Sequence, residues 1–118
     1  MTECINILEH NLQIIAASTL KARLVGLLKS LSCPLFLPHC KAIHTFGMRE
    51  PLHLLWLGAE GQIVRKDIEV KPGRIRICLK AKSVVEFLSA QDSAQAMDRY
   101  KIGDSVNLHP HDQLVEMD

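Results

Sequence analysis

The chain has 118 residues, of which 47% are hydrophobic, and a formal net charge of +1 at pH 7. At this size we expect one domain, with a core that needs no metal or disulfide, because such a chain buries about two thirds of the surface that its unfolded form exposes. The near-neutral charge argues against a strongly basic, nucleic-acid-binding domain.

We expect no secretory signal and no membrane-spanning segment. Residues 1–10 lack the basic start and the apolar run of a secretory signal. The longest apolar stretch is interrupted by Ser18, Lys21 and Arg23, so no run of about 18 apolar residues is available to span a bilayer. The four cysteines have irregular spacings, which are typical of reduced thiols. We therefore expect a cytoplasmic protein with no membrane partner.

The first predicted elements are a hairpin and a helix. Residues 4–17 hold two apolar runs around a polar pivot at residues 9–11, which favours two strands joined by a turn. Either hydroxyl residue at positions 18 and 19 can then cap one short helix around residues 19–30, where leucines recur at helical spacing. Pro34 ends this helix, and the string CPLFLPHC predicts an apolar loop after it.

From residue 41 onward, short β-favouring runs alternate with turn residues. The predicted strands cover residues 42–46, 52–57, 62–70, 74–79, 83–88 and 102–108. The run 83–88 is also compatible with a turn of helix. So many strands without long helices predict a mainly β fold, an antiparallel barrel or sandwich. We expect a single domain over residues 1–108 and a C-terminal tail, residues 109–118, that frays.

Two strands have distinctive residues. The strand around Trp56 is the most apolar and is predicted to be central and buried. Glu86 is an acid within an otherwise apolar strand. A buried carboxylate needs a partner, and Arg23, Arg49 and His44 are the candidates.

Several motifs together resemble a known family. The strings IHTFGMREPLHLLWLGAEGQIVR and KPGRIRICLKAKSVVEF resemble DUF192, a family of small bacterial and archaeal proteins without an assigned biochemical function. Arg23, Gly26 and Leu27 resemble its early RxxGL element, and Gly103 with Asp104 resembles its late GD pair. The likeness covers most of the chain, and its centre matches the family signature IHTFGMxxPID.

The resemblance implies a compact, mainly β structure of sandwich or jelly-roll character with one short helix. It implies no catalytic residues, because none are established for the family. Two positions depart from the family pattern. His53 replaces the aspartate of the signature, and Gln91 replaces a usual glycine.

The candidate ligand-binding site combines polar residues of the signature with those of neighbouring strands. It comprises His44, Thr45, Arg49, His53, Glu86 and Arg23. His44 could act as a general base or a ligand-binding donor, and Arg49 could hold an anionic group. In the structural alternative, His44 is half-buried and hydrogen-bonded to the backbone and a neighbouring side chain, while Met48 fills the core.

A metal site is not predicted. Zinc-binding residue types gather at Cys33, His39, Cys40 and His44, but two of them are adjacent and the cysteines lack the usual ligand spacing. The chain has no GxSxG, HExxH, P-loop or Rossmann motif. The sequence therefore predicts no cofactor and no metal, and it gives no positive indication of an enzyme.

The stretch from residue 71 to residue 82 alternates basic and apolar side chains. One strand face would carry Arg74, Arg76, Lys80 and Lys82 with Cys78, and the other would bury Ile75, Ile77, Leu79 and Ala81. The basic face is either a polyanion-binding stripe or a solvated face that prevents edge-to-edge pairing.

Three functions are compatible with these patterns. The first is a non-enzymatic module around His44 that binds a small ligand or a protein. The second is a hydrolase-like or metal-assisted enzyme using His44, His53 and Glu86. The third is polyanion binding through residues 74–82. We expect a monomer or a weak homodimer, and we do not expect a nucleic-acid partner.

Overall fold

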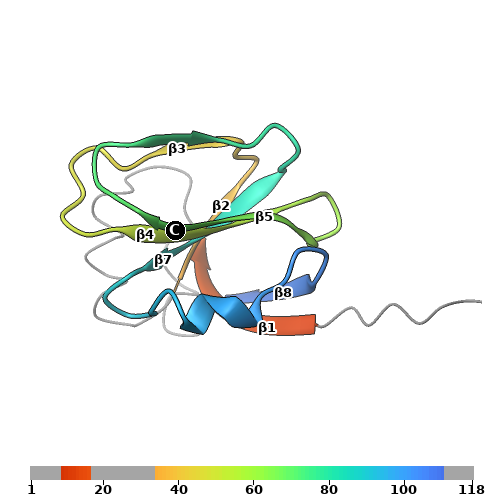
Figure 1. Cartoon of the computed structure of the whole chain (residues 1–118). Coiled ribbons are helices and arrows are strands. Elements are labelled where there is room, and N and C mark those ends of the chain that lie inside the picture. The colour runs from red at the N-terminus through yellow and green to blue at the C-terminus, as the bar shows by residue number, and fades with distance from the viewer. Residues whose placement is uncertain (1–8, 17–33, 111–118) are drawn as a thin grey trace, which may run out of the picture.

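The computed structural model describes residues 9–16 and 34–110, and about half of them lie in strands (Figure 1). The elements are β1 (Glu9–Ala16), β2 (Leu35–Pro38), β3 (Ala42–His44), β4 (Leu52–Leu57), β5 (Ile63–Val70), β6 (Ile75–Ile77), β7 (Ser83–Leu88), the 3-10 helix η1 (Ala96–Arg99) and β8 (Ser105–Pro110). No helix in these residues reaches seven residues, so the predicted mainly β class is confirmed. The helix predicted around residues 19–30 lies outside the described residues, as do residues 111–118. No helix in the described ranges is long and apolar enough to cross a membrane.

The strands form a six-stranded sheet in the order β5-β4-β7-β2-β1-β8 and a two-stranded sheet of β3 and β6. β5, β4, β7 and β2 pair antiparallel, whereas β1 runs parallel to both β2 and β8. The predicted antiparallel arrangement therefore does not extend to β1. The outer strands β5 and β8 approach each other through a bridge between Gln62 and Ser105, but the sheet is not closed, so the predicted barrel is also wrong.

The hairpin predicted over residues 4–17 is wrong at its pivot, because Glu9, His10 and Asn11 lie inside β1. Their polarity serves the pairing with β8. Glu9 accepts a hydrogen bond from Asn107, and Asn11 is bonded to His109 across the two strands. A run of polar residues is typical of a turn, but within a strand the same residues can form hydrogen bonds to side chains of the neighbouring strand.

Most of the later strands match their predictions. The strands predicted over residues 52–57 and 83–88 are β4 and β7 with the same bounds, and β8 extends to Pro110. The predicted loop CPLFLPHC instead contains β2, whose residues pair antiparallel with β7. Pro38 is the last residue of β2, where a proline interrupts few ladder hydrogen bonds.

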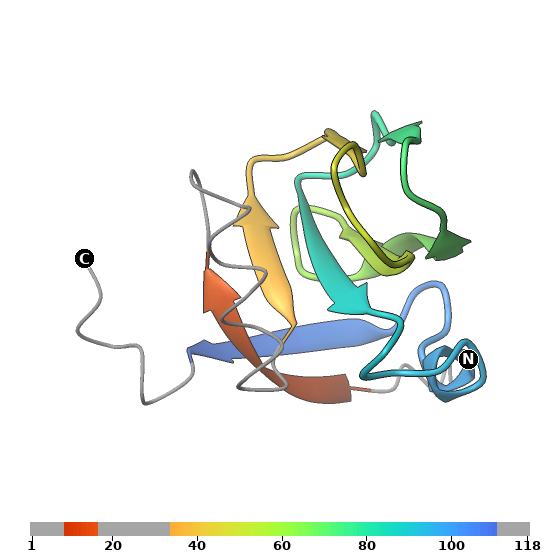
Figure 2. The ribbon, with the colours of Figure 1, turned by 90° about the vertical axis from the view of Figure 1, so that its left-hand side faces the viewer.

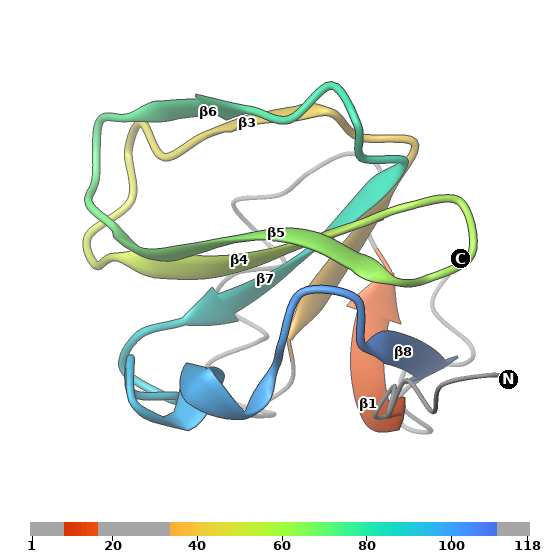
Figure 3. The same cartoon turned by 45° about the vertical axis from the view of Figure 1, so that its right-hand side comes forward.

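Two apolar clusters occupy the two faces of the large sheet. The first lies between that sheet and the β3–β6 sheet, which stand apart as separate layers (Figure 3), and its buried members are Leu35, Ile43, Leu52, Leu54, Trp56, Val70, Cys78, Ala81, Val84 and Leu88. The second lies on the opposite face and includes residues of β1, η1 and β8, and its members are Ile14, Leu55, Leu57, Ile63, Val85, Phe87, Met97, Tyr100 and Val106. β1 and β8 lie at the end of the molecule away from β3 and β6 (Figure 2). Every residue of β4 is buried between β5 and β7, as predicted for the Trp56 strand.

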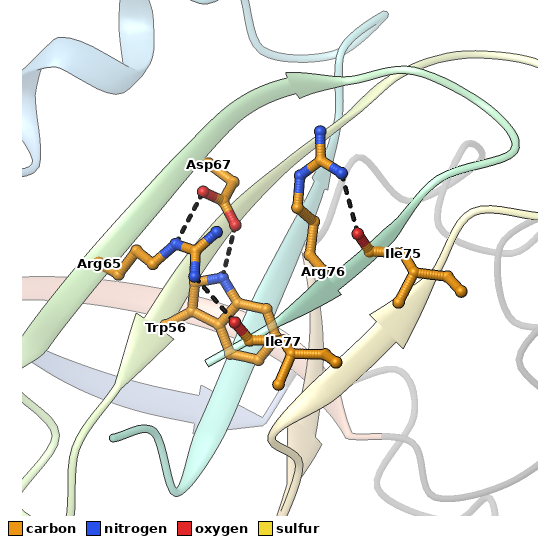
Figure 4. A network of polar contacts seen from close by, with 6 residues as sticks. All are labelled: Trp56, Arg65, Asp67, Ile75, Arg76 and Ile77. Atoms are coloured by element: carbon orange, nitrogen blue, oxygen red, sulfur yellow. Dashed lines mark hydrogen bonds and ion pairs between the residues drawn. The ribbon is translucent and has the colours of Figure 1, made fainter. Parts of the chain in front are cut away.

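One polar network joins the core to the two-stranded sheet (Figure 4). The buried Trp56 indole N–H donates to Asp67 Oδ2 at 2.9 Å, and Arg65 Nε donates to Asp67 Oδ1 at 3.0 Å. Arg65 Nη1 also donates to the Ile77 carbonyl at 2.8 Å, and Arg76 Nη1 donates to the Ile75 carbonyl at 2.9 Å. These bonds tie β4, β5 and β6 together and cap two carbonyl groups of β6.

Replacing Asp67 with alanine removes the acceptor of the buried Trp56 indole and releases Arg65. We expect the free energy of unfolding to fall by about 1–3 kcal/mol, the usual cost of leaving a buried donor unsatisfied. Asp67→Asn keeps one oxygen for the indole and should lose less. Urea unfolding followed by the fluorescence of the single tryptophan measures both values.

The matched control is Glu60→Ala, which removes an exposed carboxylate and should change stability by no more than about 0.5 kcal/mol. An Asp67→Ala loss no larger than that of Glu60→Ala would contradict the assigned role of the network.

Candidate functional site

The outer surface of the β3–β6 sheet exposes a group of large apolar side chains. Its register pairs Ala42 with Ile77 and His44 with Ile75, and alternation along the strands turns these residues away from the core. Ile75 is 56% exposed, Ile77 55% and Leu79, just beyond β6, 76%. We call His44, Phe46, Ile75, Ile77 and Leu79 the β3–β6 outer surface.

His44 and Phe46 form the aromatic part of this surface. Their rings stack with centroids 5.0 Å apart and an interplanar angle of 27°, and Phe46 is 55% exposed. The Phe46 amide donates to His44 Nδ1 at 3.2 Å, which fixes the ring beside its own backbone. His44 thus lies at the surface, and the structural alternative of a half-buried histidine is wrong.

The orientation predicted for residues 74–82 is wrong in its main feature. Ile75, Ile77 and Leu79 were expected in the core, but all three are exposed, while Cys78 from the expected basic face is buried. β6 ends at Ile77, and the turn that follows puts Ala81 into the core as expected. Alternation in the sequence separates two faces of a strand but does not tell which face meets the core.

Thr45 is fully buried and fastens β3 to the turn before β6. Its hydroxyl donates to the Lys71 carbonyl at 2.7 Å and accepts from the Arg74 amide at 2.8 Å. The Thr45 carbonyl also accepts from the amides of Met48 and Gly73. These bonds use the side chain and the carbonyl of Thr45 within the protein, so the residue supports the surface from beneath.

His53 is also fully buried, on the face of β4 that contacts the second cluster. The Glu69 amide donates to His53 Nδ1 at 3.0 Å, so the proton sits on Nε2, which donates to the Asp92 carbonyl at 2.7 Å. Glu69 has a positive φ of 54° at a bulge where β5 has an extra residue opposite His53. His53 therefore accepts the hydrogen bond of the Glu69 amide in the bulge and, through Asp92, anchors the chain after β7.

Glu86 is buried in β7 and lies opposite Leu35 of β2 and Leu54 of β4. Cross-strand partners share a face, and His53 lies opposite Phe87, the neighbour of Glu86 in β7. Glu86 and His53 consequently point to opposite faces of the large sheet. His44 points outward from the other sheet, so the three residues of the enzyme hypothesis do not converge.

The other predicted site residues add no further convergence. Arg49 is exposed after β3, and Arg23 lies outside the described residues. Within residues 9–16 and 34–110, no three histidine, cysteine, aspartate or glutamate side chains gather in a way that could hold a metal ion.

Sequence reasoning missed a partly buried pair between His10 and Asp104. His10 Nε2 lies 2.8 Å from Asp104 Oδ2, which also accepts from the Lys101 amide, and the His10 ring contacts the Tyr100 ring at 4.6 Å. The pair joins β1 to the turn before β8. Its sequence signal was the GD pair at residues 103 and 104, but the partner lies 94 residues away along the chain.

Burial raises the pKa of the Tyr100 phenol above its usual value of 10.0. The negative charge of Asp92 acts in the same direction, whereas the charge and hydrogen bond of Arg99 oppose it. The raised pKa means that the folded state favours the neutral phenol.

Comparison with known proteins identifies no relative: no family model, curated protein or solved structure matches the chain.

We expect His53→Leu to lower the free energy of unfolding by about 1–3 kcal/mol, because it leaves the Glu69 amide and the Asp92 carbonyl without their ring partner. His44→Ala, at the exposed histidine, should change it by no more than about 0.5 kcal/mol. Urea unfolding compares the two. Equal losses would contradict the distinction between a supporting and a surface histidine.

The raised pKa of Tyr100 predicts a loss of stability at alkaline pH. Well below pH 10.0 the phenol is neutral in both states, and its full contribution to stability is present. As the pH rises further, the unfolded state ionises first, so stability falls until the folded-state pKa is passed. Urea unfolding should show a larger alkaline loss of stability in the wild type than in Tyr100→Phe. The difference between the two proteins isolates the contribution of Tyr100, because other titrating groups contribute to both.

The absorbance of the phenolate reports this titration directly, because Tyr100 is the single tyrosine of the chain. Its midpoint should be higher in the folded protein than in urea. A folded-state midpoint at or below that of the unfolded chain would contradict the burial effect.

Proposed function

We propose that the protein is a non-enzymatic binding or interaction module of the DUF192 type, and that the β3–β6 outer surface around His44 is its binding site. The observation that carries the proposal is the exposure of Phe46, Ile75, Ile77 and Leu79 on one small sheet and the residues just beyond its strands. Contiguous exposed apolar side chains with polar surroundings commonly mark interaction sites, whereas single ones do not.

The way in which this surface is held also supports a binding role. Lys41 Nζ donates to the carbonyls of Leu79 and Ala81 and thereby fixes the turn that presents the Leu79 side chain. Thr45 fixes the opposite end of the two-stranded sheet, and Arg65 fixes Ile77. A surface held in place before binding loses less conformational freedom when a partner arrives.

The enzyme hypothesis has less support. A hydrolase-like or metal-assisted site needs His44, His53 and Glu86 within a few ångströms of one another. Alternation places them on three different faces, and both ring nitrogens of His53 are used in hydrogen bonds to the backbone. These observations favour binding over catalysis.

Polyanion binding is the second candidate, and one observation favours it. Segments 40–49 and 71–82 hold seven of the fourteen basic residues and none of the thirteen acidic ones. Retention on heparin that falls steeply with salt would support this function. The four cations predicted as one stripe do not share a strand, however, because β6 spans only Ile75–Ile77.

The remaining expectations belong to the same proposal. We propose a cytoplasmic protein that is a monomer or a weak homodimer. The like charges of the two segments that carry the β3–β6 outer surface disfavour symmetric pairing of two copies through it.

A photoreactive amino acid at position 77 tests the binding site. In cells or extracts, we expect it to form adducts with a macromolecule or a lipid, while the same group at exposed Ile102 forms far fewer. Equal adducts at both positions, or none at 77, would contradict the proposal. Catalytic turnover lost in His44→Ala would instead favour the enzyme.

A further inference from the structure

We infer that the partner of the β3–β6 outer surface is an anionic lipid surface, on which the protein docks peripherally. This inference rests on the proposed binding function and names its partner. The expectation of no membrane partner came from the lack of a spanning segment, which peripheral docking does not need.

The apolar side chains provide the part that enters the lipid interface. Phe46, Ile75, Ile77 and Leu79 are each more than half exposed. They belong to the two-stranded sheet and the residues just beyond it, at one extreme of the described part of the molecule, so no other described element obstructs its approach to a flat surface (Figure 1). Peripheral proteins gain affinity when such side chains are buried at the headgroup and acyl boundary.

The charge distribution provides the attraction and the orientation. The two segments that carry the surface hold seven basic side chains and no acidic one, and the rest of the chain holds seven basic and thirteen acidic ones. Six of the seven are exposed: Lys41, Arg49, Lys71, Arg74, Lys80 and Lys82. An anionic surface would therefore attract this side of the molecule.

The composition favours lipid over a protein partner. Cores of protein interfaces are depleted in lysine and enriched in aromatic residues, methionine and arginine. Here four of the seven cations are lysines, and the single tyrosine and tryptophan are both buried elsewhere. Lysine suits a lipid surface, because its long stem covers apolar area while its ammonium group stays at the headgroups.

The backbone of β6 also argues against an extended peptide as the partner. A peptide that adds a strand gains its affinity from free backbone groups at a sheet edge. The Ile75 and Ile77 carbonyls of β6 already accept hydrogen bonds from Arg76 and Arg65 (Figure 4). Charged side chains at an edge are a common protection against strand addition.

Sedimentation with lipid vesicles tests the inference on the full chain. We expect it to sediment with vesicles of phosphatidylcholine and phosphatidylserine but not with pure phosphatidylcholine, and we expect added salt to weaken the binding. Lys80→Gln with Lys82→Gln should weaken it by about fivefold for each charge removed. Phe46→Ser with Leu79→Ser should weaken it by about tenfold or more.

Matched controls alter the same residue types outside the surface. Lys101→Gln and Ile102→Ser change an exposed lysine and an exposed isoleucine before β8, and both should bind vesicles like the wild type. All of these side chains are exposed, and circular dichroism with urea unfolding verifies that each variant is folded.

Two results would overturn the inference. One is no sedimentation of the folded wild type with anionic vesicles. The other is vesicle binding that Phe46→Ser with Leu79→Ser leaves unchanged, since charge alone would then be sufficient and polyanion binding would be the better explanation. Photo-adducts with a protein at position 77, without vesicle binding, would reject the lipid but retain the proposed binding function.

Discussion

The arrangement of the two sheets depends on one carboxylate. Asp67 accepts from the Trp56 indole with one oxygen and from Arg65 with the other, and Arg65 continues to the backbone of β6. A buried indole N–H needs an acceptor, and a carboxylate in the interior needs a donor or a cation. Asp67 supplies the acceptor that the Trp56 indole needs, and Arg65 supplies the cation that Asp67 needs. The bond from Arg65 to the Ile77 carbonyl then holds the β3–β6 sheet against the large sheet.

The histidines illustrate how position determines role. His53 lies on the central strand, where both nitrogens bond to backbone groups and stabilise a bulge and the chain after β7. His44 lies on a peripheral strand, where its ring stacks on Phe46 at the surface. The presence of His53 is therefore accounted for by hydrogen bonding, whereas His44 belongs to the exposed surface.

Much of the fold could be predicted, because strands leave local signals. The runs 52–57 and 83–88 have the β-favouring residues and bounding turns of the observed strands. The predictions failed where long-range pairing decided the outcome. Polar residues 9–11 lie in a strand because β8 provides partners for them, and CPLFLPHC contains a strand because β7 pairs with it. Of the predicted site, His44 remains on the candidate surface, whereas Thr45 and His53 support the structure.

The sequence by itself determined the mainly β class, the buried central strand at Trp56, and the segregation of basic residues into two segments, because these depend on residue type and spacing alone. Only the tertiary structure decided which side of the alternating stretch 74–82 faces outward. The inner side of the β3–β6 sheet has room for Ile43 and Cys78 against the first cluster, so Ile75 and Ile77 are left at the surface. Periodicity defines two faces of a strand, but only packing against another layer assigns one of them to the core.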